Sequence, residues 1–107
     1  MFATLPTGTY RYVSPDENRL SLTLLLRKSG SAIIGVELLG ERELSCFRGQ
    51  AQDNRIVYVT QVYPPYDPAS DWQSGQVIEM ASLVSRGQSP TAAEQEALET
   101  CVQLFWR

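Results

Sequence analysis

The sequence predicts a mainly β domain, in which a six-stranded antiparallel meander forms a small barrel or half-barrel and one C-terminal α-helix packs on it. Short segments that favour β-structure recur at roughly ten-residue spacing up to about residue 84. Two of these segments contain interior glycines, which are typical of bulges and bends in coiled sheets. The last eighteen residues show helical periodicity instead. With 107 residues and 43% hydrophobic content, the chain has room for a single domain over residues 1–107 with one core.

Turn residues separate the segments whose side chains favour strands. The predicted strands are residues 8–13, 20–27, 32–39, 44–51, 55–63 and 76–84. In the second strand, leucines at every other position share one face and anchor the core. The third and fourth strands contain Gly35 and Gly49. The only lysine, Lys28, falls in a predicted turn, which indicates a solvated tip rather than a buried amine.

The C-terminal helix, about residues 90–106, is predicted from its start signals and its apolar stripe. Ser89 is a suitable N-cap and Pro90 takes the first helical position, with acidic residues in the early turns. Apolar side chains then recur at spacings of three or four. They are Ala93, Ala97, Cys101, Leu104 and Phe105, flanked by Leu98 and Val102. We expect this stripe to lie on the sheet, with Phe105 and Trp106 covering an open end or seam of the barrel.

Composition excludes several classes of function. Twelve acidic and nine basic residues give a net charge of −3, so no basic surplus is present and nucleic acid is not expected as a partner. Histidine is absent, and two cysteines are too few for a four-thiolate zinc site. We therefore expect no enzyme, no catalytic residue, no metal and no cofactor. No apolar run approaches a membrane span and no secretory leader is visible, so the expected location is the cytoplasm.

The segment from Tyr63 to Trp72 is the most unusual part of the chain. Three large aromatic residues and three prolines share ten residues, and prolines can hold aromatic faces toward a ligand, a sugar ring or a partner peptide. The candidate binding residues are Tyr63, Tyr66, Trp72 and Asp67. The structural alternative is that the prolines stiffen a wide crossover, while Tyr66 and Trp72 pack back on the barrel mouth.

Two carboxylates, Glu37 and Glu79, fall within predicted strands, whereas most of the others fall in turns or on the helix surface. An arginine across the sheet, namely Arg11, Arg48 or Arg55, could neutralise each of them. A solvated outer face of the sheet accounts for the same residues without an ion pair.

Cys46 and Cys101 allow two arrangements. A disulfide between the fourth strand and the helix would close a loop of roughly 55 residues and would stabilise the fold by about 4 kcal/mol in the chain-entropy model. Two buried free thiols are the other arrangement, which a reducing cytosol favours. A reactive thiol is disfavoured because no histidine can accept its proton.

Several motifs resemble known families. The glycine-x-aromatic pattern within residues 5–12 is similar to the start of calycin-type barrels such as lipocalins. The chain also resembles small uncharacterised cyanobacterial proteins that open with LPxGxYxY. These proteins continue through a CFxG strand and a Pro-Pro-Tyr loop, and they end on a helix with a cysteine followed by aromatic residues. The resemblance implies a shared fold without an assigned activity, and it makes Cys46 and Cys101 a family feature, either as a disulfide or as core residues.

These observations lead to two hypotheses. The first is a non-enzymatic binding or interaction module that contacts a protein partner through residues 63–72. The second is a carrier of a small apolar molecule or pigment, held in a dry, calycin-like pocket of several hundred Å³ under the helix. Six strands filled by their own leucines leave little room for an internal ligand of the lipocalin kind. The sequence also allows a homo-oligomer, because the chain end around Leu104 and Phe105 could contact a second copy across a two-fold axis.

Overall fold

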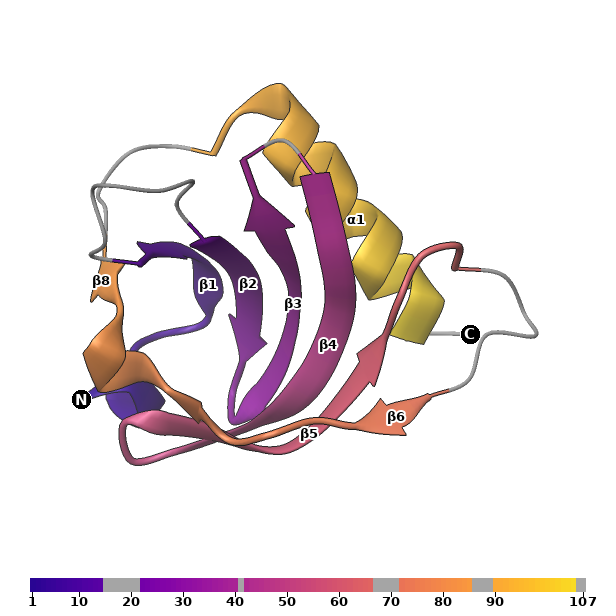
Figure 1. Ribbon diagram of the computed structural model, residues 1–107. Coiled ribbons are helices and arrows are strands. Elements are labelled where there is room, and N and C mark those ends of the chain that lie inside the picture. The colour runs from indigo at the N-terminus through magenta and orange to yellow at the C-terminus, as the bar shows by residue number, and fades with distance from the viewer. Residues whose placement is uncertain (15–21, 41, 67–71, 86–89, 106–107) are drawn as a thin grey trace.

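The computed structural model describes residues 1–14, 22–40, 42–66, 72–85 and 90–105, with the backbone alone at 84 and 85. Its largest part is an antiparallel meander of five strands, which confirms the predicted mainly β fold (Figure 1). These strands are β1 (Gly8–Val13), β2 (Leu22–Ser29), β3 (Ala32–Leu39), β4 (Arg42–Gln52) and β5 (Arg55–Val62). The bounds of β1 and β3 are those that the sequence predicts, and β4 is longer at both ends. β2 ends two residues later than predicted, and residues 20 and 21 of the predicted strand lie outside the described residues.

The sixth predicted strand is not continuous. Instead, residues 73–85 form three two-residue strands and one short helical turn. They are β6 (Gln73–Ser74), β7 (Ile78–Glu79), η2 (Met80–Ser82) and β8 (Val84–Ser85). β6 and β7 pair with β5, but β8 pairs with β1. Because the segment changes partner while it crosses the open side of the sheet, it cannot stay in one hydrogen-bonded ladder.

The pairing leaves a strongly curved, open sheet, compatible with the half-barrel expected from the sequence (Figure 1). Its order is β6-β5-β4-β3-β2-β1-β8. The register shifts between Arg48 and Gln50, where the single residue Gly49 of β4 lies opposite two residues of β5, Tyr58 and Val59. The bulge is therefore in β5, and the prediction that Gly49 itself marks a bulge was wrong. Gly35 has a different role, because a Cβ atom there would lie 2.4 Å from Cζ of Phe47. The glycine therefore makes room for an aromatic ring that packs on the sheet.

Helix α1 (Ala92–Phe105) begins later than predicted. The backbone N–H of Glu94 donates to Thr91 Oγ1 at 3.1 Å, and the N–H of Thr91 donates to Glu94 Oε1 at 2.8 Å. This reciprocal pair is a capping box, so Thr91 is the N-cap and Pro90 precedes the helix. The prediction of Pro90 as the first helical residue was wrong because a second start signal follows it. Ser89 and Trp106 lie outside the described residues.

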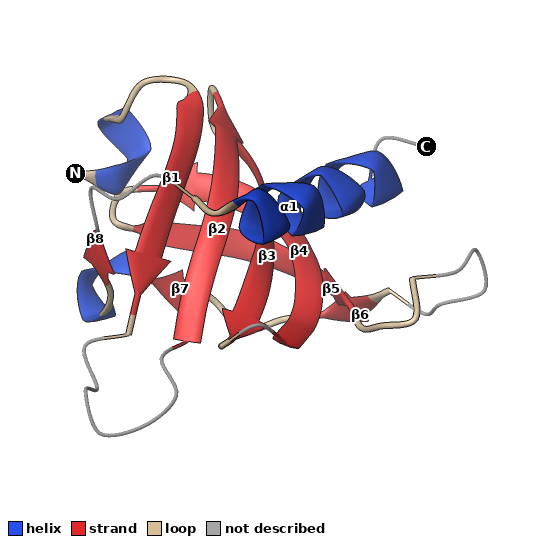
Figure 2. Cartoon of the chain, turned by 90° about the horizontal axis from the view of Figure 1, so that it is seen from above, coloured by secondary structure: helices blue, strands red, loops and turns tan. Residues whose placement is uncertain are grey.

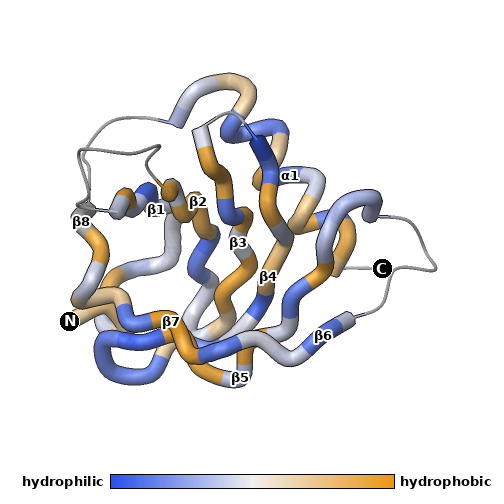
Figure 3. The backbone as a smooth tube through the Cα atoms, viewed as in Figure 1, coloured by the Kyte–Doolittle hydropathy of each residue, from blue (hydrophilic) through white to orange (hydrophobic). Residues whose placement is uncertain are grey.

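Both faces of the sheet are buried, so the core has two parts where the sequence predicted one. Helix α1 covers the convex face (Figure 2). Its contacts there include Leu25, Val36, Leu38, Cys46 and Val62. A second cluster fills the concave face with Leu24, Leu26, Ile33, Phe47, Ile56 and Val59, together with Phe2, Tyr12 and Met80. The tube in Figure 3 shows the corresponding mixture of hydrophobic positions along the strands and a hydrophilic turn between β4 and β5.

The N-terminal turn η1 (Phe2–Thr4) closes one end of the concave face. The Phe2 ring packs edge-to-face on Tyr12 at 6.0 Å between centroids. The following residues reach β2, where Lys28 Nζ donates to the carbonyl of Leu5 at 2.8 Å and to that of Gly30 at 2.6 Å. Lys28 is only 3% exposed, so its predicted place at a solvated tip was wrong. The sequence pattern could not reveal a cover supplied by a segment more than twenty residues away.

A disulfide joins Cys46 of β4 to Cys101 of α1, residues 55 positions apart in the sequence. Both cysteines are fully buried between the sheet and the helix. Of the two arrangements that the sequence allowed, the structure therefore contains the covalent one, although a reducing cytosol would favour free thiols.

Candidate ligand-binding site

An open cavity of about 520 Å³ lies on the concave side of the sheet and is accessible to solvent. The sheet lines it at the start of β2 and at the ends of β3 and β5, which is the end opposite to η1. The segment that crosses the open side supplies the facing wall. The lining residues are Leu22, Leu24, Glu37, Gln61, Tyr63, Ser74, Gly75, Gln76, Val77, Ile78, Glu79, Ser82 and Leu83. The cavity therefore exists because residues 73–83 span the gap between β5 and β1 without filling it.

Three polar side chains in this lining form a hydrogen-bonded chain. Tyr63 Oη donates to Gln61 Oε1 at 3.3 Å, and Gln61 Nε2 donates to Glu37 Oε1 at 3.3 Å. Gln61 and Tyr63 share a face because they are two residues apart near the end of β5. The hydroxyl thus orients the amide, and the amide donates to the carboxylate.

The reach from Gln61 to Glu37 depends on a small residue between them. β4 separates β3 from β5, so the two side chains start about 10 Å apart, which is two strand spacings. Ser45 is the direct cross-strand partner of Glu37 and lies on the same face. It is fully buried, and its Oγ has no hydrogen-bond partner among the described residues. A larger side chain at this position would separate Gln61 from Glu37.

Gly75 holds the crossing segment close to β5. Its backbone N–H donates to the carbonyl of Val59 at 2.8 Å. A Cβ atom on Gly75 would lie 2.8 Å from Val59 Cγ1 and 2.9 Å from Gln61 Oε1. Only glycine permits this approach without displacing the Gln61 amide.

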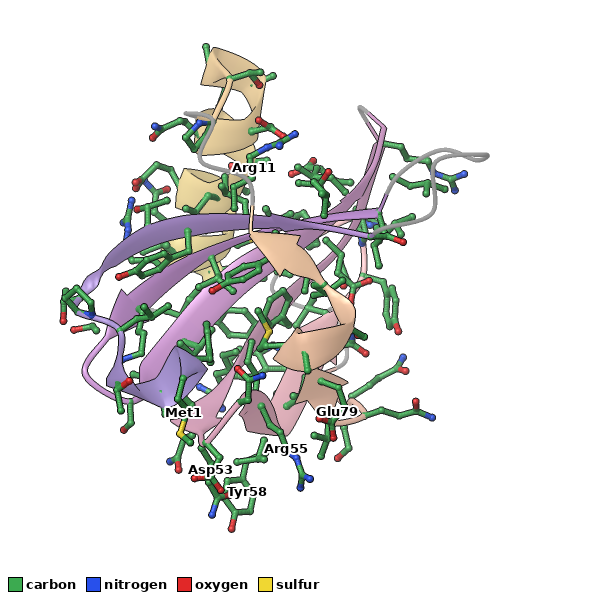
Figure 4. The ribbon with its side chains drawn as sticks, turned by 90° about the vertical axis from the view of Figure 1, so that its left-hand side faces the viewer. Met1, Arg11, Asp53, Arg55, Tyr58 and Glu79 are labelled. Carbon is green, nitrogen blue, oxygen red and sulfur yellow. A yellow bond between two sulfur atoms is a disulfide. The ribbon has the colours of Figure 1, made fainter. Side chains whose placement is uncertain are left out.

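Both charged residues in the described part of the cavity lining, Glu37 and Glu79, are acidic. Glu79 forms an ion pair with Arg55, whose Nε lies 3.1 Å from Glu79 Oε1 (Figure 4). This pair confirms that an arginine across the sheet can neutralise one strand carboxylate. Glu37 has no ion pair within the described part of the chain, and its partial burial raises the pKa of its carboxyl group. The prediction that Glu37 lies on a solvated outer face was wrong, because the face it occupies is the concave one.

The other two arginines considered for this role lie elsewhere. Arg11 Nε pairs with Glu94 of α1 at 3.1 Å. The guanidinium of Arg48 lies over the Trp72 ring, 4.6 Å from its centroid.

The aromatic residues predicted to form one binding loop lie in three different environments. Tyr63 is 47% exposed at the cavity, whereas Tyr66 packs against the core under α1. Burial, together with the charge of Glu43, raises the pKa of Tyr66 to about 12. Trp72 is 48% exposed and packs edge-to-face on Phe105, with 5.2 Å between the ring centroids. Asp67 lies outside the described residues.

The space under the helix, where the sequence suggested a dry pocket, is filled by the disulfide and its apolar neighbours. An open groove of about 400 Å³ runs beside the start of α1, between the helix and the turn after β3. Three carboxylates, those of Glu43, Glu94 and Glu96, line it. Its open, acidic character differs from the enclosed apolar pocket that the carrier hypothesis required.

Sequence reasoning missed Gln61 and placed Glu37 on the wrong face. The available signal was the alternation along β3, in which Glu37 shares its face with Ile33 and Gly35. Since β3 is apolar at nearly every position, alternation alone could not show which face would enclose a cavity.

Comparisons with protein-family models, with curated protein sequences and with solved structures find no match. The resemblance to cyanobacterial proteins and to calycins therefore stays a prediction. Among the described residues, no helix is long and apolar enough to cross a membrane.

Proposed function

We propose that this protein is a non-enzymatic binding module that holds a small organic molecule in the concave cavity. The observation that carries the proposal is the hydrogen-bonded chain from Tyr63 through Gln61 to Glu37 inside a cavity of about 520 Å³. Ligand sites in proteins commonly have volumes of about 300–1,000 Å³, with apolar walls and a few oriented polar groups. Leu22 and Leu24 supply an apolar wall here.

A binding role fits this site better than catalysis. Of the two carboxylates in the described lining, Glu79 is held by Arg55, and Glu37 has a neutral amide beside it. Nucleophilic catalysis needs a nucleophile within hydrogen-bond reach of a base. In the described lining, the group within hydrogen-bond reach of Glu37 is the Gln61 amide, which is not a nucleophile. The arrangement therefore suits recognition of a polar group on a ligand.

The test is native mass spectrometry of the protein purified from its own source. We expect a bound mass of a few hundred Da, the size that such a cavity accommodates. Val77→Trp should remove the bound mass, because this half-exposed residue lines the cavity and tryptophan would occupy its entrance. Gln50→Trp, which adds the same side chain at an exposed position of β4, should retain it. A bare chain in all three proteins, or equal retention by both variants, would contradict the proposal.

A second candidate function is the binding of a protein partner at the surface formed by Arg48, Trp72 and Phe105. The observation that favours it is the half-exposed indole of Trp72, held by contacts on two sides with Phe105 and Arg48. Exposed, rigidly held tryptophan and arginine side chains are typical of binding hot spots.

This candidate predicts that Trp72→Ala abolishes recovery of a partner in a pull-down, while the variant remains folded. Tyr58→Ala is the matched control, since Tyr58 is 78% exposed and points away from the sheet (Figure 4). Tyr66→Ala is unsuitable, because Tyr66 packs against the core under α1. Equal recovery by Trp72→Ala and the wild-type protein would exclude this surface.

A further inference from the structure

We infer that the ligand of the concave cavity carries a protonated amine, which binds to the carboxylate of Glu37. This inference rests on the proposed function of the cavity as a ligand site. It adds the chemical class of the ligand, an organic ammonium ion with an apolar body.

The first argument is that Glu37 is a partly buried carboxylate that has no cation partner among the described residues. The ion pairs in the described part of the chain join Arg11 to Glu94, Arg27 to Glu99 and Arg55 to Glu79. The described hydrogen bond to the Glu37 side chain comes from a neutral amide and is long, at 3.3 Å. A carboxylate that is partly removed from water is stabilised far better by a cation than by one neutral donor.

The second argument is that the Glu37 carboxylate has an oxygen available for a ligand. Gln61 contacts Oε1, and no hydrogen bond to Oε2 is present among the described residues. Tyr63 donates to the oxygen of the same amide, which keeps the amide nitrogen directed at Glu37. The amide therefore favours one orientation of the carboxylate within the cavity lining before any ligand binds, which lowers the entropic cost of binding.

The third argument is the charge of the remaining lining. It contains a second carboxylate, Glu79, and neither lysine nor arginine occurs among its described residues. Among the described lining residues, an anionic ligand would meet the carboxylate of Glu37 without a cation beside it, and only the carboxylate of Glu79 is paired, with Arg55. A neutral alcohol would gain only an ordinary hydrogen bond. A primary ammonium offers three donors and a positive charge, and an attached hydrocarbon body could contact Leu22 and Leu24.

Three probes of similar shape test this inference: benzylamine, benzyl alcohol and benzoate. Each is titrated into the isotope-labelled protein, and the backbone amide shifts of Gly75, Gln61 and Val77 are followed by NMR. Probes of this size bind in about the millimolar range. We expect benzylamine to bind about tenfold more tightly than benzyl alcohol, because its contact with Glu37 is charge-assisted. Benzoate should bind more weakly than either.

Two variants assign the selectivity to one carboxylate. Glu37→Gln should lower the affinity for benzylamine to that for benzyl alcohol while leaving the alcohol unchanged. Glu96→Gln, on the exposed surface of α1, changes the net charge equally and should preserve the tenfold preference. A nonspecific attraction between the cation and the acidic protein would be lowered equally by both substitutions.

The outcomes separate this inference from the proposed function. Equal binding of benzylamine and benzyl alcohol at the cavity amides, or a preference for benzoate, would overturn the ammonium class while leaving the cavity a ligand site. Failure of every probe to shift these amides would overturn the inference as well. In that case the native mass comparison of Val77→Trp with Gln50→Trp decides the proposed function independently.

Discussion

The two faces of the sheet bury their side chains in different ways. On the convex face, α1 packs along its length on apolar strand residues, and a disulfide fixes it there. On the concave face, aromatic and aliphatic side chains fill only the end near η1, while the other end is hollow and holds Glu37, Gln61 and Tyr63. The comparison indicates that packing on the convex face supplies most of the free energy of unfolding. The concave face can therefore keep polar groups that contribute little to that free energy.

The largest effect should follow from breaking the covalent tie on the convex face. Replacing both Cys46 and Cys101 by alanine removes a link that closes a loop of 55 residues. We expect the free energy of unfolding to fall by about 4 kcal/mol in the chain-entropy model. Urea denaturation measures this loss.

The same double variant tests whether the two faces are independent. If they are, the amide signals of Gly75 and Gln61 should keep their positions in the folded protein, because these residues lie on the other side of the sheet. A loss of stability below about 1 kcal/mol, or large shifts throughout the cavity, would show that the division between the faces is wrong.

A matched pair of leucine substitutions compares packing on the two faces directly. Leu98 of α1 is fully buried, whereas Leu22 is partly buried in the cavity wall. Leu98→Ala should cost about 3 kcal/mol, since it removes apolar contacts and leaves a void in a filled core. Leu22→Ala should cost about 1 kcal/mol or less, because its neighbours already border an open space. If urea denaturation showed equal losses in the free energy of unfolding for Leu98→Ala and Leu22→Ala, the proposed difference in packing would be wrong.

The sequence revealed the parts of this comparison that depend on local patterns. The bounds of β1 follow from alternation and those of β3 from an apolar run, each next to turn residues, and the apolar stripe of α1 follows from helical spacing. The start of α1 was misplaced because a second start signal, the capping box of Thr91 and Glu94, follows Pro90.

The remaining features depend on contacts between distant segments. The interruption of the sixth strand arises from its change of partner from β5 to β1. The burial of Lys28 requires the segment around Leu5 to fold over it. The cavity requires Gly75 to approach Val59, and no local periodicity encodes that approach. Sequence patterns therefore indicated the filled face more completely than the hollow one.

The smallest effect concerns the energetic cost of Glu37. Its partial burial raises the pKa of its carboxyl group, so the folded state binds a proton more readily than the unfolded chain does. By linkage, stability falls as pH rises from the unfolded pKa through the raised folded pKa, and this loss persists at higher pH. Glu37→Gln removes the ionisable group and should therefore raise the Tm by about 2 °C at neutral pH, with no gain below the unfolded pKa of Glu37.

Thermal unfolding at a series of pH values measures this difference between the variant and the wild-type protein. Glu79→Gln is the matched control, because Glu79 lines the same cavity but pairs with Arg55, and both side chains are more than half exposed. An exposed ion pair of this kind contributes little to stability, so Glu79→Gln should show no increase in Tm at any pH. A gain for Glu37→Gln alone would show that the concave face retains a carboxylate at the expense of stability, as a ligand site does. Equal behaviour of the two variants would show instead that Glu37 is tolerated without cost, which would remove the energetic contrast between the two faces.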